Sequence, residues 1–160
     1  MKIEAENEIL VPIDFSEFCA NTVKYALHHF PVDKLRVIHV TQTPIVASYG
    51  AVEAISSDDI LAECEREMQA FYEEYDIPTE LKYVIHIGNP AERIAAFAKN
   101  NPVEAVLISS HGRTGVTRLF LGSVSEHVVR LAPCPVIVFK ADEIQEKCRE
   151  DIAKAEAAVS

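Results

Sequence analysis

Glycine, serine and arginine are concentrated in one segment of the chain, Ser109–Ser125. This segment holds three of the five glycines and two arginines, and it contains no acidic residue, although the whole chain has a formal net charge of -10. It follows an apolar run, Ala105–Ile108, that predicts a buried strand, and it ends at Gly122-Ser123, where a helical pattern begins. Residues of this kind between a strand and a helix indicate a binding site for a polyanion.

The start of a helix can bind an anion without any catalytic side chain. Its first backbone N–H groups have no partner within the helix, and the positive end of the helix dipole favours negative charge. Gly112 and Gly115 allow positive φ angles, so successive N–H groups of the loop can point at one anion. The segment therefore predicts phosphate or nucleotide binding.

A simpler interpretation of the same segment stays open. Loops are often rich in glycine, and Ser123-x-x-Glu126 is typical of a capping box at the start of a helix. Both interpretations can hold together, because a capped helix still presents N–H groups outward. The P-loop pattern is not met, since the spacing between Gly115 and Gly122 is wrong and no lysine precedes Ser123.

The composition limits the class of protein. A chain of 160 residues with 49% hydrophobic content is sufficient for one domain with one core. The 25 acidic residues outnumber the 15 basic ones, which argues against a nucleic-acid partner or attraction to anionic lipid. No signal-peptide pattern and no apolar run of membrane length is present, so we expect a cytoplasmic protein with no membrane partner.

The cysteines do not indicate a metal site or a disulfide. They have no close pair and no histidine at metal-ligand spacing, and most of them fall on apolar helical stripes. We expect reduced, largely buried residues at Cys19, Cys64, Cys134 and Cys148.

Five apolar runs predict β-strands, and amphipathic helical patterns lie between them and after the last. The predicted strands are residues 8–14, 35–40, 80–86, 103–108 and 136–139. The helical patterns begin near Ser16, Ser57, Asn89, Ser123 and Asp142, and a long loop is expected over 42–55. This alternation predicts an α/β fold of three layers, with a doubly wound parallel five-stranded sheet covered by helices on both sides.

Two helix starts and one helix face are predicted in detail. Ser16 is a good N-cap, and Asn89-Pro90-Ala91-Glu92 combines a cap, a first-turn proline and an acid three residues after the cap. In the fourth helix, from about Ser123 to Leu131, the inward residues are expected to be Val124, Val128 and Leu131.

The expected topology brings Asp14 to the glycine-rich segment. If the chain winds to one side and then crosses to the other side of the first strand, the strand order is 3-2-1-4-5. Ligands in such sheets bind outside the carboxyl ends of the strands, where the winding reverses between strands one and four. Asp14 ends the first strand, and Ser109–Ser125 follows the fourth. Two features found separately thus converge on one cleft.

Several motifs, in the order found here, resemble the universal stress protein family. They are Ile-Leu-Val-Pro-Ile-Asp-Phe-Ser at 9–16, His39-Val40, Gly88-Asn89-Pro90, and Ser110-His111-Gly112 followed by Gly122-Ser123. The match covers residues 8–140. The resemblance implies a Rossmann-like, adenine nucleotide alpha hydrolase-like fold, with residues 1–140 as the universal stress protein domain. The apolar spacing after Asp142 predicts residues 141–160 as an amphipathic helical extension.

The resemblance also implies a nucleotide site. The phosphate pattern of the family's nucleotide-binding members falls here on Ser109, Gly112, Gly122 and Ser123, with serine in place of the first glycine. By the same resemblance, Asp14 binds the ribose hydroxyls, Pro12 lines the adenine pocket and the Val40 backbone reads the adenine edge. The residues implied around the phosphates are Ser110, His111, Gly112, Arg113, Gly122, Ser123, Val124 and Ser125. Two alternatives stay open, because Asp14 could only support the cap at Ser16 and His111 could only bond loop backbone.

The implied function is that of a homodimeric, ATP-binding stress-response protein that acts as a nucleotide-dependent switch or interaction module. Its ligand would be ATP with Mg²⁺, or AMP or ADP, and its dimer would form through Val136–Phe139, which is apolar on both faces and lacks the charges that protect an edge strand. A slow ATP hydrolase and a stress protein that acts through protein contacts alone are the alternatives. Efficient catalysis is not expected, since the predicted cleft offers no P-loop lysine, no carboxylate pair and no clear base.

Overall fold

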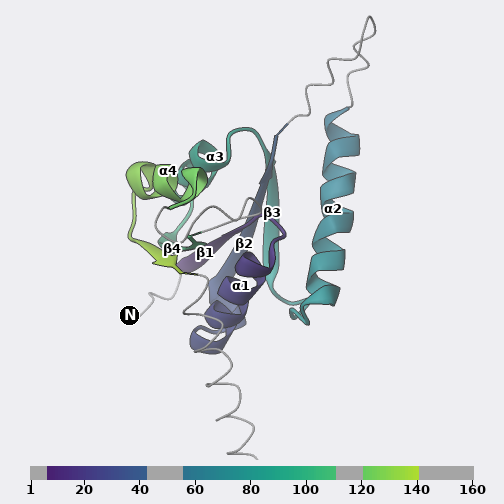
Figure 1. Ribbon diagram of the computed structural model, residues 1–160, viewed down its shortest axis with the longest axis horizontal. Coiled ribbons are helices and arrows are strands. Elements are labelled where there is room, and N and C mark those ends of the chain that lie inside the picture. The colour runs from purple at the N-terminus through teal and green to yellow at the C-terminus, as the bar shows by residue number, and fades with distance from the viewer. Residues whose placement is uncertain (1–6, 43–55, 111–120, 141–160) are drawn as a thin grey trace, which may run out of the picture.

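The five apolar runs form one parallel sheet in the computed structural model of the chain, which describes residues 7–42, 56–110 and 121–140 (Figure 1). The strands are β1 (Glu8–Ile13), β2 (Leu35–Thr41), β3 (Lys82–Ile87), β4 (Val103–Ser109) and β5 (Val136–Phe139). Their order is β3-β2-β1-β4-β5 and every pair is parallel, which confirms the predicted topology. The predicted loop over 42–55, except Gln42, and the predicted extension over 141–160 lie outside the described residues.

Helices cover both faces of the sheet. They are α1 (Glu17–His29), α2 (Ser57–Glu74), α3 (Pro90–Asn100) and α4 (Ser123–Leu131), with a short 3-10 helix, η1 (Val32–Lys34), before β2. The α1 and α2 side chains pack in one core cluster and those of α3 and α4 in another. Figure 1 shows α2 beside β3 and the pair α3 and α4 together on the other side of the sheet. Across the described part of the chain, no helix combines the length and the apolar character needed to span a membrane.

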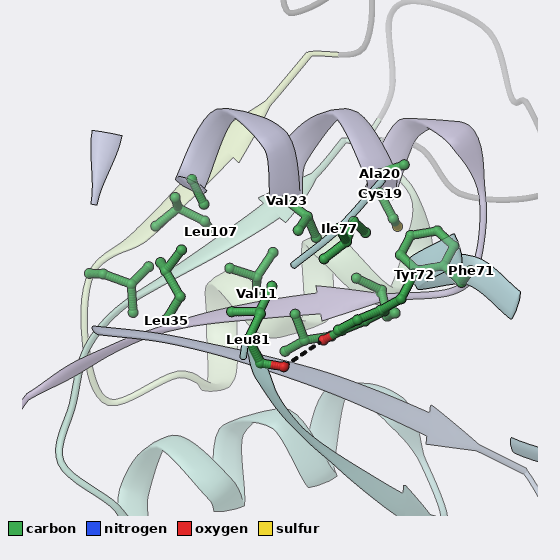
Figure 2. Packing of buried hydrophobic residues seen from close by; sticks show 14 of the residues in the cluster. Val11, Cys19, Ala20, Val23, Leu35, Phe71, Tyr72, Ile77, Leu81 and Leu107 are labelled. Carbon is green, nitrogen blue, oxygen red and sulfur yellow. Dashed lines mark hydrogen bonds between the residues drawn. The ribbon is translucent and has the colours of Figure 1, made fainter. Parts of the chain in front are cut away.

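The central strands are buried on both faces because their side chains alternate between the two clusters. In β1, Ile9 and Val11 belong to the α1 side and Leu10 to the α3 side. Figure 2 shows Val23, Ala20 and Cys19 of α1 directed toward the sheet on which Val11 lies. At the edge of this cluster, the Tyr72 hydroxyl donates a hydrogen bond of 3.1 Å to the Leu81 carbonyl (Figure 2). Such packing holds the strand ends in fixed positions.

Three of the helices have an N-cap residue whose side chain accepts a backbone hydrogen bond. The Ser16 Oγ accepts a hydrogen bond from the Cys19 N–H, and the Asn89 side chain accepts one from the Glu92 N–H, with Pro90 as the first helical residue. Both caps confirm the predictions. Helix α2 begins at Ser57 as expected, and its cap is Ser56, whose Oγ accepts from the Asp59 N–H.

Helix α4 corrects two predictions. Its N-cap is Gly122, which makes no side-chain cap hydrogen bond, so the capping box predicted for Ser123 and Glu126 is wrong. Its buried residues are Ser125 and Val128, whereas Val124 is 37% exposed and Leu131 is 51% exposed. The inward face is rotated from the predicted one because the Ser125 hydroxyl bonds a buried carbonyl of β4, 2.8 Å away.

Candidate functional site

A cavity of about 260 Å³ opens where β1 and β4 end. Asp14 follows the last residue of β1, Ser109 ends β4, and Gly122 caps α4 on the other side of the cavity. The direction of winding reverses between these two strands, which is the usual binding position in open parallel sheets. The prediction that Asp14 and the glycine-rich segment share one cleft is confirmed for the described residues.

Eight residues predicted for the site line this cavity. They are Pro12, Asp14, Val40, Ser109, Gly122, Ser123, Val124 and Ser125. Ser110 is buried behind it, where its carbonyl accepts a hydrogen bond of 2.8 Å from the Gly122 N–H. His111, Gly112 and Arg113 lie outside the described residues. The binding role of each of these residues stays a prediction.

Six further lining residues were not predicted from the sequence. They are Ile13, Cys19, Ile38, Pro90, Ile94 and Ile108. Five of them are apolar, and together with Pro12 and Val40 they give the cavity an apolar wall, which suits a flat heterocycle. Asp14, Cys19 and the serines at 109, 123 and 125 supply the polar part of the lining. The cavity thus combines an apolar wall, which a flat heterocycle can contact, with polar residues that can bond polar groups of a ligand.

The Asp14 carboxylate is held by the start of α1. Its Oδ1 accepts hydrogen bonds from the Ser16 N–H at 3.2 Å, the Ser16 hydroxyl at 2.6 Å and the Cys19 thiol at 2.9 Å. Asp14 therefore supports the cap residue, and this role does not exclude a ligand, since the same residue lines the cavity. A carboxylate fixed by several donors presents a defined geometry to a bound hydroxyl.

The turn between Asp14 and Ser16 has an unusual backbone. Phe15 has a φ of +62°, a left-handed conformation that is uncommon for a bulky residue. Its ring packs against His39, 4.2 Å away between centroids, and against Phe71, 5.7 Å away. His39 in turn pairs through Nδ1 with the Ile13 carbonyl at 3.1 Å. These contacts hold the turn in the conformation that places Asp14 at the cavity.

Short hydrogen bonds join the end of β4 to the start of α4. The Ser125 hydroxyl donates to the Ser109 carbonyl at 2.8 Å, and the Gly122 N–H donates to the Ser110 carbonyl at the same distance. Gly122 has an ordinary φ of -61°, so glycine is not needed for a left-handed backbone. The absence of a Cβ instead allows close approach, because a Cβ there would lie 3.3 Å from the Ser110 oxygen, a tight contact. Since the cap residue has no side chain, no N-cap side chain bonds the first-turn N–H groups of α4 within the described residues, and such groups can bind an anion.

Cys19 is the polar lining residue that the sequence analysis missed. Burial, followed by the charge and hydrogen bond of Asp14, raises the pKa of its thiol to about 12. The thiol is therefore protonated at neutral pH and acts as a donor. Its position offered a signal, because it is the third residue of the helix that begins just after Asp14, and first-turn side chains lie near the preceding strand end.

The raised pKa of Cys19 predicts a specific loss of stability at high pH. In the unfolded chain the thiol ionises near its ordinary pKa, so above pH 9 the unfolded state binds fewer protons than the folded state. The free energy of unfolding should then fall with rising pH toward about 12, with a contribution from this thiol of up to about 1.4 kcal/mol per pH unit. Urea denaturation between pH 8 and 11 checks this. Cys19→Ser should lose less stability over the same range, and parallel curves for the two proteins would contradict the assignment.

Comparisons with known proteins agree with this architecture. A family model described as the Universal stress protein family matches residues 7–140. Universal stress protein MJ0531 of Methanocaldococcus jannaschii is 28% identical over 140 residues, covering 83% of this chain and 81% of the relative.

Solved structures show the same fold. The structure of MJ0577, from the same organism, has a TM-score of 0.68 and 28% sequence identity, covering 84% of this chain and 96% of that chain. A universal stress protein of Archaeoglobus fulgidus in complex with dAMP has a TM-score of 0.53 and 20% identity, covering 82% of this chain and 96% of that chain.

Proposed function

The chain belongs to the universal stress protein family, and we propose that it binds an adenine nucleotide in the cavity between the ends of β1 and β4. One observation carries the proposal: Asp14 and the first turn of α4, whose cap has no side chain, line the same partly apolar cavity. The relative from Archaeoglobus fulgidus that binds dAMP supports the choice of nucleotide class. The proposed ligand is ATP with Mg²⁺, and AMP and ADP are the alternatives.

The cavity lining suggests how the parts of the nucleotide are distributed. The apolar wall, with Pro12 and Val40, suits the adenine ring, and Asp14 can accept hydrogen bonds from ribose hydroxyls. The phosphates would lie at the start of α4, where backbone N–H groups and the helix dipole favour an anion. Ser110, His111, Gly112 and Arg113 are proposed to complete this phosphate site.

The described lining residues favour binding over efficient hydrolysis. Asp14 is the one carboxylate among them, and its Oδ1 already accepts three hydrogen bonds. Mg²⁺ in nucleotide sites is held largely by phosphate oxygens and water, so it can arrive with ATP without a cage of protein ligands. We propose a nucleotide-dependent switch or interaction module, with slow ATP hydrolysis as the second candidate.

The test is the thermal stability of the protein with adenine nucleotides. A ligand that binds only the folded state at a hundred times its Kd adds about 2.7 kcal/mol to the free energy of unfolding. ATP with Mg²⁺, ATP alone, ADP and AMP should each be compared with tripolyphosphate, which lacks the adenosine part. If no adenine nucleotide at millimolar concentration changes the thermal unfolding midpoint, the remaining hypothesis is a stress protein that acts through protein contacts alone. Chromatographic detection of ADP after long incubation with ATP would distinguish a slow ATP hydrolase from a protein that only binds ATP.

We also propose a homodimer through β5. This strand is at one edge of the sheet, where its Ile137 is 39% exposed, and the neighbouring α4 has Val129 48% exposed. An apolar edge without charges favours pairing with a second copy. The predicted helical extension over 141–160 lies outside the described part of the chain.

Replacing Ile137 by lysine should break this dimer. A charge at the middle of the paired edge would be buried without a partner, so we expect a monomer at micromolar concentration. Sedimentation equilibrium checks this, and Ala70→Lys on the exposed surface of α2 is the matched control, expected to stay dimeric. A monomeric wild-type protein would contradict the proposal.

A further inference from the structure

We propose that Cys19 is a positioning residue for the nucleotide site, in which its thiol links the Asp14 carboxylate to the Ser109 hydroxyl. The proposal rests on the function proposed above and adds to it a residue that sets the contact with the ribose. The three side chains come from three elements, namely the end of β1, the first turn of α1 and the end of β4. All three line the same cavity.

The distances define a continuous chain of side-chain contacts. The Cys19 Sγ lies 2.9 Å from the Asp14 Oδ1 and 3.5 Å from the Ser109 Oγ. Both are within the range of hydrogen bonds that involve sulfur. Cys19 and Ser109 are buried, so the contact between them is shielded from competing water, and the contact of Cys19 with Asp14 is part-buried.

The chemistry of the three groups determines which of them donates in each hydrogen bond. A carboxylate oxygen can only accept, and a thiol has a single proton, so the proton of Cys19 is directed to Asp14. In the second contact the sulfur must then accept, and the Ser109 hydroxyl donates. The high pKa of Cys19 agrees with this order, since the thiol stays protonated while it faces a carboxylate. The hydrogen bonds are therefore donated from Ser109 to Cys19 and from Cys19 to Asp14.

The thiol restrains Asp14 in a way that Ser16 alone does not. Ser16 is two residues away in the chain and belongs to the same turn, so its two hydrogen bonds fix Asp14 only to that turn. Cys19 connects the carboxylate to β4, whose last residue begins the glycine-rich segment proposed to hold the phosphates. The family pattern has glycine at position 109, and the serine found here supplies the hydroxyl that the thiol contacts. We infer that the thiol fixes the carboxylate orientation that the ribose meets.

The expected effect of Cys19→Ala is a selective loss of affinity for ribonucleotides. Removing one neutral donor should weaken AMP binding by about three- to tenfold, in line with a single hydrogen bond. Binding of 2′-deoxy-AMP should weaken less, because this ligand offers Asp14 one hydroxyl fewer. Cys19→Ser keeps a donor and should restore much of the preference for AMP.

Isothermal titration calorimetry of the full chain with AMP and with 2′-deoxy-AMP tests the proposal. The ratio of the two affinities is the decisive readout, since a mere packing defect would lower both affinities equally. Cys134→Ala, at the half-buried cysteine of the α3 and α4 side, should leave both affinities unchanged. Ser109→Ala should lower the ratio less than Cys19→Ala, and the double variant should be no worse than Cys19→Ala alone.

The outcomes separate this proposal from the one on which it rests. If the wild-type protein binds no adenine nucleotide, the nucleotide function itself is wrong. If it binds AMP and the ratio in Cys19→Ala equals that of the wild type, the positioning role is wrong and the site stands. If Cys19→Ala does not fold, the same comparison is made with Ser109→Ala, which removes the contact of the thiol with β4. An unchanged ratio in Ser109→Ala would then overturn the role of the thiol.

Discussion

Gly122→Val should lower the affinity for adenine nucleotides by at least about 30-fold, while the protein keeps its fold. Gly122 caps α4 and lines the cavity, so two added methyl groups would cover the first-turn N–H groups that are proposed to hold the phosphates. Losing charge-assisted hydrogen bonds to a phosphate accounts for an effect of this size, about 2 kcal/mol. The backbone of Gly122, with φ of -61° and ψ of 150°, is accessible to valine. The strain to be relieved is the contact of the new Cβ with the Ser110 carbonyl oxygen, which would be 3.3 Å long.

A smaller substitution at the same position is the matched control. Gly122→Ala adds a Cβ that would lie 3.3 Å from the Ser110 carbonyl oxygen, a tight contact that a small shift can relieve. Its nucleotide affinity should fall between those of the wild type and the valine variant. Calorimetry on proteins whose circular dichroism matches the wild type measures both. Equal affinity in wild type and Gly122→Val would show that the phosphates do not bind at the start of α4.

Leu107→Ala should reduce the free energy of unfolding by about 3 to 4 kcal/mol, the typical cost of removing a fully buried leucine side chain. Leu107 is in the middle of β4, fully buried in the cluster that includes Val11 and Leu35 (Figure 2). The sheet is covered on both sides there, so the surroundings can collapse only partly into the space that is left.

Urea denaturation measures this loss. Leu27→Ala, at a half-buried position of α1 that packs against the same cluster, is the control and should cost less than half as much. A cost below about 1 kcal/mol for Leu107→Ala would mean that the core rearranges around β4, and the cavity should then change shape as well.

The sheet could be predicted because its signals are local. Each strand is an apolar run bounded by turn residues, and the caps at Ser16 and Asn89 are short-range patterns that the structure confirms. The rule that parallel crossovers are right-handed restricted the topology, and the strand order followed on the assumption that the chain winds to one side of the first strand and then to the other. With the order known, Asp14 and Ser109 had to lie at the same edge, which the cavity confirms.

The errors arise where a contact distant in sequence decides the local structure. Apolar spacing in α4 predicted an inward Val124 and Leu131, but the Ser125 hydroxyl bonds the carbonyl of Ser109, sixteen residues earlier, and this rotates the helix. The capping box failed for a similar reason, since the hydrogen bond from the Gly122 N–H to the Ser110 carbonyl fixes Gly122 as the cap and leaves Ser123 as the first helical residue.

Cys19 shows the same limit at the site itself. As a member of an apolar helical stripe it was correctly predicted to be buried, and it is. Its contact with Ser109 spans ninety positions of the chain, so no periodic pattern could indicate that its thiol faces a cavity.

The left-handed backbone of Phe15 predicts that the proposed binding site is less stable than the fold as a whole. A bulky residue in this region carries about 1 to 2 kcal/mol of conformational energy, which persists only while the surrounding contacts outweigh it. Those contacts are the His39 and Phe71 rings, and Phe71 belongs to α2 and is absent from the described cavity lining. If α2 loosens, the turn can relax to an extended backbone and carry Asp14 away while the sheet persists. Mild heat or denaturant should therefore switch the site off before it melts the protein, so the site would respond to the same stress that threatens the fold.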